Sequence, residues 1–267
     1  MRLGQEIQEV LWRLMERRFH CTACGKCCFG WLPLSLDDAI ANAGRFPLAM
    51  IWTTLRQGAK AFALTAELGT TVELRNRKRI ALQIAPTAYI PPAFPCPALA
   101  PDGLCGIHAD KPARCRTMPF SPYREEGDQA DLLVPKPGWL CDTTAGAPVV
   151  YRDKKIVFRE DFDRERRALE RQAIPLRAYA DRLVDNPEVA AAVEKAARKA
   201  RGGYVVLNFS AILPRLPQVD AAAFSRLQLP VLTEFAERTA GVAGLADYHR
   251  YYRDNAAGMA QFLERQR

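Results

Sequence analysis

The sequence predicts an α+β protein, with a cysteine-rich N-terminal half of short strands and loops and a mostly helical C-terminal half. Two observations lead to this prediction. All eight cysteines lie before residue 142, and none follows. Short β-type segments are concentrated in the first 160 residues, and helical periodicity dominates after them. We therefore expect a cysteine-cluster domain over residues 1–150, with little regular sheet, and a helical domain over residues 151–267.

Helices are expected at three places in the N-terminal half. Apolar residues at three- and four-residue steps predict an amphipathic helix over residues 3–19. Ser35 followed by Asp38 resembles a capping box, which predicts a short helix that Gly44 can close. A further helix is expected over residues 47–68.

The strand signals of this half are short. Residues 72–74 and 80–84 read as two strands joined by a polar turn, and residues 149–158 read as a hairpin. Six prolines in residues 86–101 predict an extended, rigid loop, which carries Cys96.

The C-terminal half contains one helix with clear signals at both ends. Asn186 is a good N-cap, Pro187 suits the first helical position, and Gly202 with Gly203 can end the helix. His249 and the tyrosines around it predict a packed helix face. The other expected elements are helices over residues 160–173, 175–185, 220–240 and 246–265, and a strand or buried helical turn over residues 203–209.

Composition and charge restrict the compartment and the partners. No signal-peptide core and no apolar run of membrane length occurs, so we expect a cytoplasmic protein without a membrane partner. The net charge of +8 is spread along the chain, and the basic run at residues 75–79 lies at a predicted turn, so nucleic acid is disfavoured. A protein partner or a protein substrate is the remaining class of macromolecular partner.

The stretch CTACGKCC, residues 21–28, contains four of the cysteines. Cysteines in a reducing compartment are more often metal ligands or catalytic groups than disulfides, so a disulfide framework is the minor alternative. Cys21, Cys24 and Cys27 have the C-x2-C-x2-C spacing that supplies three ligands to a four-iron (4Fe-4S) cluster. Cys96, followed by proline, is a candidate for the remote fourth ligand.

Zinc is the alternative metal. C-x2-C followed by glycine, as at Gly25, is typical of a zinc knuckle. Cys27 and Cys28 are adjacent, and neighbouring side chains diverge on an extended backbone, which suggests two sites or a ligand beside a free thiol. A second site would combine Cys28, Cys105, Cys115 and Cys141, with His108 as a substitute ligand.

Basic residues surround one of these cysteines. Lys111, Arg114 and Arg116 flank Cys115 and would offset the negative charge of a thiolate-bound metal centre. They could equally hold a carboxylate or phosphate, or lie as solvated charges on the surface. His20 precedes the first cysteine and is a further ligand candidate, although a role at a helix end suits it better. No serine-hydrolase, zincin or P-loop pattern occurs, and no catalytic residue is assigned.

The cysteines recur with companions that resemble a known family. CTACGKCC at residues 21–28, CPALAPDGLCGIHADKPARCRTMPF at residues 96–120 and the later Cys141 resemble the cysteine-cluster family described as a zinc- or iron-chelating CxxCxxCC domain (YkgJ-type). The resemblance covers about residues 20–141. It implies a metal or iron–sulfur centre ligated by Cys21, Cys24, Cys27, Cys28, Cys96, Cys105, Cys115 and Cys141.

One branch of this family comprises the flagellin lysine N-methylases, for which an iron–sulfur centre and S-adenosylmethionine are thought to be used. The resemblance to that branch is more distant, and it implies protein lysine methylation as a third function. The chain has no glycine-rich nucleotide loop of the Rossmann type, so this function rests on the family alone.

Overall fold

The computed structural model of the protein describes residues 16–199 and 202–266. The chain divides into two compact units, each built from two separate segments. Unit 1 comprises Met1–Cys28 and Ala98–Arg167, and unit 2 comprises Phe29–Pro97 and Ala168–Arg267. This division differs from the boundary expected near residue 150, because unit 2 takes strands from the N-terminal half and helices from the C-terminal half.

Unit 1 contains a small antiparallel sheet in the order β1-β6-β7. Asp153 and Lys154 both have positive φ, as the turn of the predicted hairpin requires, which confirms the hairpin over residues 149–158. The core beside it consists of Phe120, Leu133, Tyr151, Ile156 and Phe162. The elements of this unit are β1 (Arg17–Arg18), α4 (Ala113–Thr117), η1 (Glu126–Asp128), η2 (Ala130–Leu133), β6 (Val149–Arg152), β7 (Lys155–Ile156) and the start of α5 (Glu160–Val184).

The helix expected over residues 3–19 lies mostly outside the described residues. At its described end, Arg17 and Arg18 pair with β6 as strand β1. The expected helices over residues 160–173 and 175–185 form the single helix α5, which contains Pro175.

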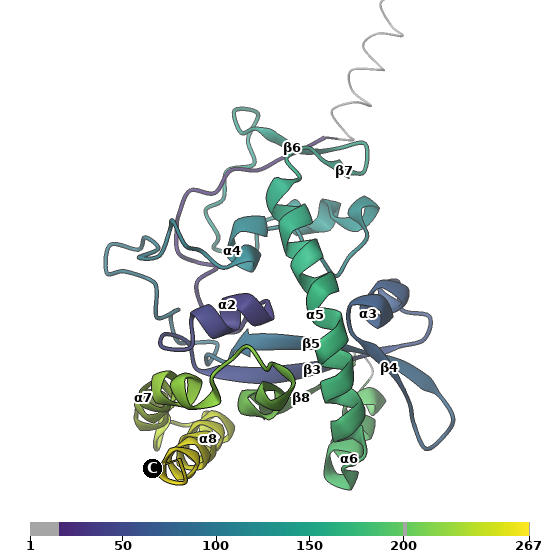
Figure 1. Ribbon diagram of the computed structural model, residues 1–267. Helices are drawn as coiled ribbons and strands as arrows, with labels where there is room; N and C mark the ends of the chain where they lie inside the picture. The colour runs from purple at the N-terminus through teal and green to yellow at the C-terminus, as the bar shows by residue number, and fades with distance from the viewer. Residues whose placement is uncertain (1–15, 200–201, 267) are drawn as a thin grey trace, which may run out of the picture. The chain divides into compact units, whose positions relative to one another are not determined.

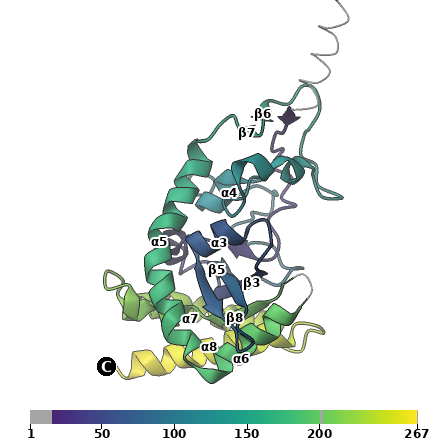
Figure 2. The same ribbon diagram turned by 90° about the vertical axis from the view of Figure 1, so that its right-hand side faces the viewer.

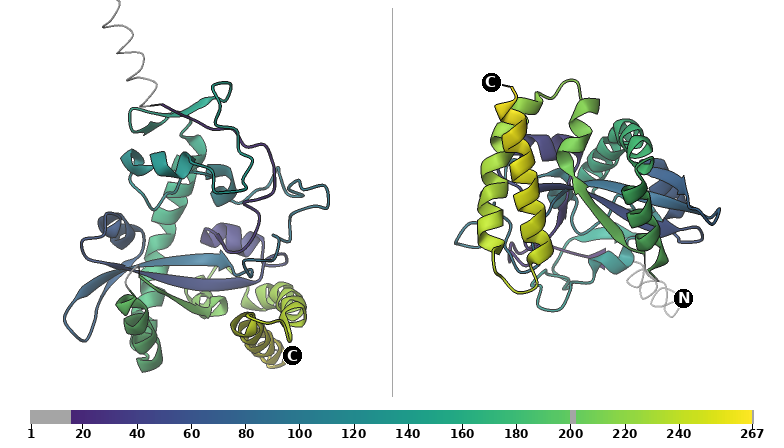
Figure 3. Two further views of the ribbon diagram at one scale, coloured as in Figure 1. Left: turned by 180° about the vertical axis from the view of Figure 1, so that it is seen from behind. Right: turned by 90° about the horizontal axis from the view of Figure 1, so that it is seen from below.

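Unit 2 contains a five-stranded antiparallel sheet in the order β2-β5-β3-β8, with β4 pairing with β5. In Figures 1 and 2, α2 and α3 lie on one side of β3 and β5, and the α7–α8 pair lies on the other. Figure 3 shows α7 and α8 running side by side. The elements are β2 (Leu32–Pro33), α2 (Leu36–Ala41), β3 (Leu48–Arg56), α3 (Phe62–Leu68), β4 (Thr70–Glu73), β5 (Arg79–Ala88), α6 (Pro187–Arg198), β8 (Tyr204–Asn208), η3 (Phe209–Arg215), α7 (Ala221–Thr239) and α8 (Ala246–Glu264).

The helix expected over residues 47–68 was wrong for its first half. Residues 48–56 form β3, which lies between β5 and β8, and only residues 62–68 are helical. Trp52 in the middle of β3 is fully buried, and most of its neighbours along the strand are buried on both faces. A strand covered on both faces loses the two-residue alternation that distinguishes a strand from a helix. The N-terminal half therefore holds more regular sheet than expected.

The predicted helix starts were confirmed at several positions. Ser35 Oγ accepts the backbone N–H of Asp38 at 3.0 Å and opens α2. Asn186 Oδ1 accepts the backbone N–H groups of Glu188 and Val189, and Pro187 is the first residue of α6. Helices α7 and α8 lie where the sequence placed them. Among the described residues, no helix combines the length and apolar character needed to cross a bilayer.

Candidate metal centre

Two distant segments of unit 1 bring Cys21 and Cys141 next to each other. His20 and Asp142 exchange both backbone hydrogen bonds, at 2.8 and 2.9 Å, in an antiparallel bridge. The hydroxyl of Thr22 donates to the carbonyl oxygen of Leu140 at 3.0 Å and extends the pairing. The residues between these contacts are Cys21 on one segment and Cys141 on the other.

The CTACGKCC stretch is wound tightly beyond Cys21. Ala23 and Gly25 have φ values of 56° and 69°, and the N–H of Cys28 donates to the carbonyl oxygen of Gly25 at 2.9 Å. A Cβ at position 25 would lie 3.3 Å from the carbonyl oxygen of Gly103, so glycine allows this loop to approach the neighbouring one closely. Gly25 therefore has the positive φ that a metal knuckle requires at this position.

The extended backbone assumed for Cys27 and Cys28 was wrong. Residues 25–28 form a turn, and the thiol of Cys28 hydrogen-bonds to that of Cys27. Adjacent side chains can approach in a turn, whereas they diverge on a strand. The divergence argument for two separate sites therefore does not apply to this pair.

Electrostatics shows that the motif thiols and Cys141 are neighbours. The pKa of Cys141 is raised, mainly by burial and then by charge repulsion from Cys24, Cys21 and Cys27. The pKa of Cys24 is lowered, first by the backbone N–H of Lys26 and then by that of Leu140. Thiolates of one centre are expected to interact in this way.

Cys27 lies next to a positive charge as well. Its pKa falls to about 6, first through the hydrogen bond from the Cys28 thiol and also through the ammonium group of Lys111. Cys21 and Cys27 are exposed, and the other six cysteines are half-buried. All eight cysteines lie among the described residues, and none of them forms a disulfide.

The remaining cysteines are held by separate local structures. Cys105 pairs with Leu99 in a tight hairpin, in which the N–H of Gly106 donates to the carbonyl oxygen of Ala98 at 2.8 Å. Cys115 lies in the single helical turn of α4. Cys96 belongs to unit 2, where its neighbour Pro95 forms a bridge with Phe29, the residue that follows Cys28.

Arg114 and Arg116, the basic residues on either side of Cys115, make different interactions. Arg116 donates to the carbonyl oxygens of Lys111, at 3.0 Å, and Ala109, and so closes its own loop. Arg114 is buried and paired with Glu165, with 3.4 Å between Nη1 and Oε2. Neither is therefore only a solvated surface charge. His20 and His108 are both exposed.

The donor set fits a thiolate-bound metal. Cys21, Cys24, Cys27 and Cys141 supply four thiols, the number that a tetrahedral zinc ion or a four-iron cluster takes. Within residues 16–199 and 202–266, no three His, Cys, Asp or Glu side chains already stand in a metal-binding arrangement. Because metal–thiolate bonds themselves draw such ligands together, these side chains would close on the metal as it binds.

The fold and the thiols define the class: a cysteine-rich metal-binding domain set into an α+β chain. The CxxCxxCC family, described as "Putative zinc- or iron-chelating domain", matches residues 20–137. These residues therefore belong to that family, and they include seven of the eight cysteines, with Cys141 just beyond the match. No curated protein and no solved structure matches the chain. The resemblance to the flagellin lysine N-methylases stays a prediction.

Proposed function

We propose that the protein carries a 4Fe-4S cluster on Cys21, Cys24, Cys27 and Cys141 and serves in a redox or group-transfer role. The observation that carries the proposal is the backbone bridge between His20 and Asp142, which puts Cys141 beside the C-x2-C-x2-C motif. When bound, such a cluster supplies one-electron transfer or a site of group transfer.

The choice of Cys141 as the fourth ligand changes the assignment made from the sequence. There, Cys96 was the candidate, and Cys141 was grouped with a second site. The bridge between His20 and Asp142 sets Cys141 opposite Cys21, and the pKa of Cys141 is raised first by burial and then by the thiols of Cys24, Cys21 and Cys27. We therefore assign it to the first centre, which leaves Cys28, Cys105 and Cys115 as the other cysteines of unit 1.

Positive charge near the motif supports a centre with excess thiolate charge. A four-iron cluster with four thiolates is anionic in its common oxidation states, and a nearby cation offsets that charge. The ammonium group of Lys111 acts on Cys27, and the buried guanidinium of Arg114 acts on Cys115. The protein's own residues thus supply cations at both groups of cysteines.

A zinc-chelating structural or interaction protein is the second candidate, because a specific feature favours it. Gly25 has positive φ and follows the second cysteine, as in a zinc knuckle, and the turn closes on the N–H of Cys28. Two zinc sites would use all eight cysteines and would leave the function to a protein partner.

Metal analysis separates the two candidates. Iron, zinc and acid-labile sulfide are measured per chain on protein produced and purified without oxygen, with a visible spectrum of the same sample. About four irons and four sulfides, with broad absorption at about 400 nm that bleaches on reduction, are expected for the cluster. About two zinc ions per chain and no colour would overturn the cluster and establish the zinc protein.

Two matched variants test the ligand assignment. Cys141→Ala should lose the iron and the colour, because it removes one of four ligands. Cys115→Ala removes an equally half-buried cysteine and should retain the cluster. A colourless Cys115→Ala together with a coloured Cys141→Ala would show that Cys141 is not the fourth ligand.

A further inference from the structure

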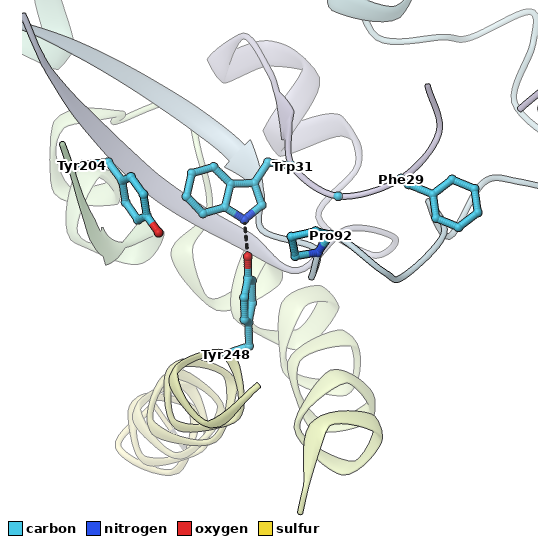
Figure 4. Close-up of a pocket in the computed structure, with 6 residues that line it drawn as sticks. Phe29, Trp31, Pro92, Tyr204 and Tyr248 are labelled. Carbon is cyan, nitrogen blue, oxygen red and sulfur yellow. Dashed lines mark hydrogen bonds between the residues drawn. The ribbon is translucent and has the colours of Figure 1, made fainter. Parts of the chain in front are cut away.

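Unit 2 contains an open pocket with aromatic walls, and none of the described residues that line it is a cysteine. Its volume is about 380 Å³, within the range of small-molecule sites. Figure 4 shows its residues, which come from the segment after Cys28, the proline-rich loop, β8 and α8. They are Phe29, Gly30, Trp31, Pro92, Tyr204 and Tyr248.

The rings of this pocket are held in place by one another. The indole N–H of Trp31 donates to the hydroxyl oxygen of Tyr248 at 2.7 Å, the dashed line in Figure 4. The Trp31 ring meets Tyr204 edge to face, with centroids 4.7 Å apart and an interplanar angle of 86°. Tyr248 stacks on the buried ring of Tyr89 at 4.4 Å and 22°. The walls are therefore preorganised.

A glycine lets two segments of the wall approach closely. Gly30 has a φ of 74°, and a Cβ there would lie 3.3 Å from the Cα of Pro92. A side chain at this position would be strained by its backbone and would crowd the neighbouring loop. The close approach places Trp31, which follows Gly30, beside Pro92 in the pocket.

The chemistry of the lining indicates its ligand. Among the described residues, no charged side chain lines the pocket, and the faces of tryptophan and tyrosine rings carry negative quadrupole charge that attracts cations. Unit 2 already uses this attraction, because the ammonium group of Lys199 lies 5.7 Å from the centroid of Tyr204.

The hydroxyl groups of Tyr204 and Tyr248 can orient a bound ligand through hydrogen bonds. Tyr248 accepts from Trp31 and keeps its own proton, and its raised pKa, caused mainly by burial, holds it neutral. Across the described residues, neither Tyr204 nor Tyr248 donates to an acceptor of the protein. A ligand with a cationic head and a hydroxyl or carbonyl acceptor nearby would use both features.

We propose that this pocket binds a small organic ammonium ion, with the alkylated nitrogen against the rings of Trp31 and Tyr204. The site is independent of which metal the cysteines hold. Its rings lie in unit 2, whereas the four proposed cluster ligands lie in unit 1.

The test compares choline with 3,3-dimethylbutan-1-ol, which has the same shape and a carbon in place of the charged nitrogen. Each is titrated into the full-length, metal-loaded protein, and binding is followed by ligand-observed NMR. Choline should bind at least about fivefold more tightly, because two ring contacts at an exposed site each contribute about two- to fivefold. Equal or tighter binding of the neutral alcohol would overturn the proposal, as would no binding of choline.

Variants at one half-exposed ring locate the effect. Tyr204→Leu keeps an apolar side chain and should weaken choline about two- to fivefold, whereas Tyr204→Phe keeps the ring, loses only the hydroxyl group and should bind choline more tightly than Tyr204→Leu does. Lys199→Met removes the ammonium group near Tyr204 and should strengthen binding. Phe158→Leu, at an exposed ring of unit 1, is the matched control. Unchanged affinity in Tyr204→Leu would contradict the site.

Discussion

Removing the negative member of the buried ion pair in unit 1 tests how the cysteine-bearing helix α4 is held. Arg114 Nη1 lies 3.4 Å from Glu165 Oε2, and the two side chains are only 11% and 6% exposed. The guanidinium also donates to the carbonyl oxygen of Phe120. Burial lowers the pKa of Arg114, and the carboxylate of Glu165 opposes that shift. The carboxylate of Glu165 therefore offsets the desolvation cost of burying the charged guanidinium of Arg114.

Glu165→Gln leaves this charge without its counterion, which costs about 3–5 kcal/mol of unfolding free energy in buried pairs. That is a large fraction of the 5–15 kcal/mol typical of a whole domain. The double change Arg114→Met with Glu165→Leu removes both charges together, and the loss of the donor to the Phe120 carbonyl costs about 1–3 kcal/mol. We therefore expect the double variant to be more stable than the Glu165→Gln single variant.

Urea unfolding measures the effect, followed by tryptophan fluorescence in a background with Trp31 and Trp52 of unit 2 changed to Phe, so that the signal comes from unit 1. Glu160→Gln is the control, because its carboxylate pairs with Arg164 at 2.6 Å but is 84% exposed. An exposed pair of this kind contributes less than about 1 kcal/mol. The reasoning is refuted if Glu165→Gln costs no more than Glu160→Gln, or if the double variant is the less stable of the two.

Three further predictions concern the helices and one tight approach in unit 2. Asn186→Ala removes the acceptor of two backbone N–H groups at the start of α6 and should lower the unfolding free energy by about 1 kcal/mol in urea, whereas Asn186→Asp should retain it. Gly69→Ala places a Cβ 2.0 Å from the carbonyl oxygen of Leu82 and should lower the unfolding free energy by about 1–3 kcal/mol. Gly258→Ala in α8 meets open space and should raise the unfolding free energy by up to about 1 kcal/mol. Thermal melts that rank the two variants in the opposite order would contradict this. Backbone N–H groups of α7 lower the pKa of Asp220. The stabilisation by this cap is therefore present above the unfolded pKa of about 3.9 and is lost as the pH falls through the lower folded pKa. The Tm of the parent protein should fall more steeply below about pH 4 than the Tm of Asp220→Asn, and parallel acid profiles of the two would speak against the cap.

Local signals in the sequence were sufficient for the ends of helices and for turns. Ser35 with Asp38, and Asn186 with Pro187, each determine a helix start through hydrogen bonds that span only two or three residues. The hairpin at residues 149–158 is equally local. Such features need no information from distant parts of the chain.

Long-range pairings explain what the sequence did not reveal. Strand β3 is identifiable only from its partners, since β5 lies some 30 residues away and β8 about 150 residues away along the chain. The candidate site has the same property. The spacing of Cys21, Cys24 and Cys27 is local and was found, whereas Cys141 joins them through a bridge between residues 20 and 142. The aromatic pocket likewise combines residues that lie far apart in the sequence.

The pairing of Phe29 with Pro95 brings together the two ends of residues 29–97, the segment that separates the two halves of unit 1 in the sequence. The N–H of Gly30 donates to the carbonyl oxygen of Phe94 at 3.2 Å, so this segment of about 70 residues begins and ends at one place. Closing an unfolded loop of about 70 residues has an entropic cost of about 4 kcal/mol. Closing a loop of about five residues, the length that remains once the ends are paired, costs about 2 kcal/mol less. Pairing the ends of residues 29–97 thus lowers the entropic cost of bringing the two segments of unit 1 together. Because this segment begins and ends at one place, a short linker in place of residues 29–97 should still let the two cysteine-bearing segments of unit 1 meet.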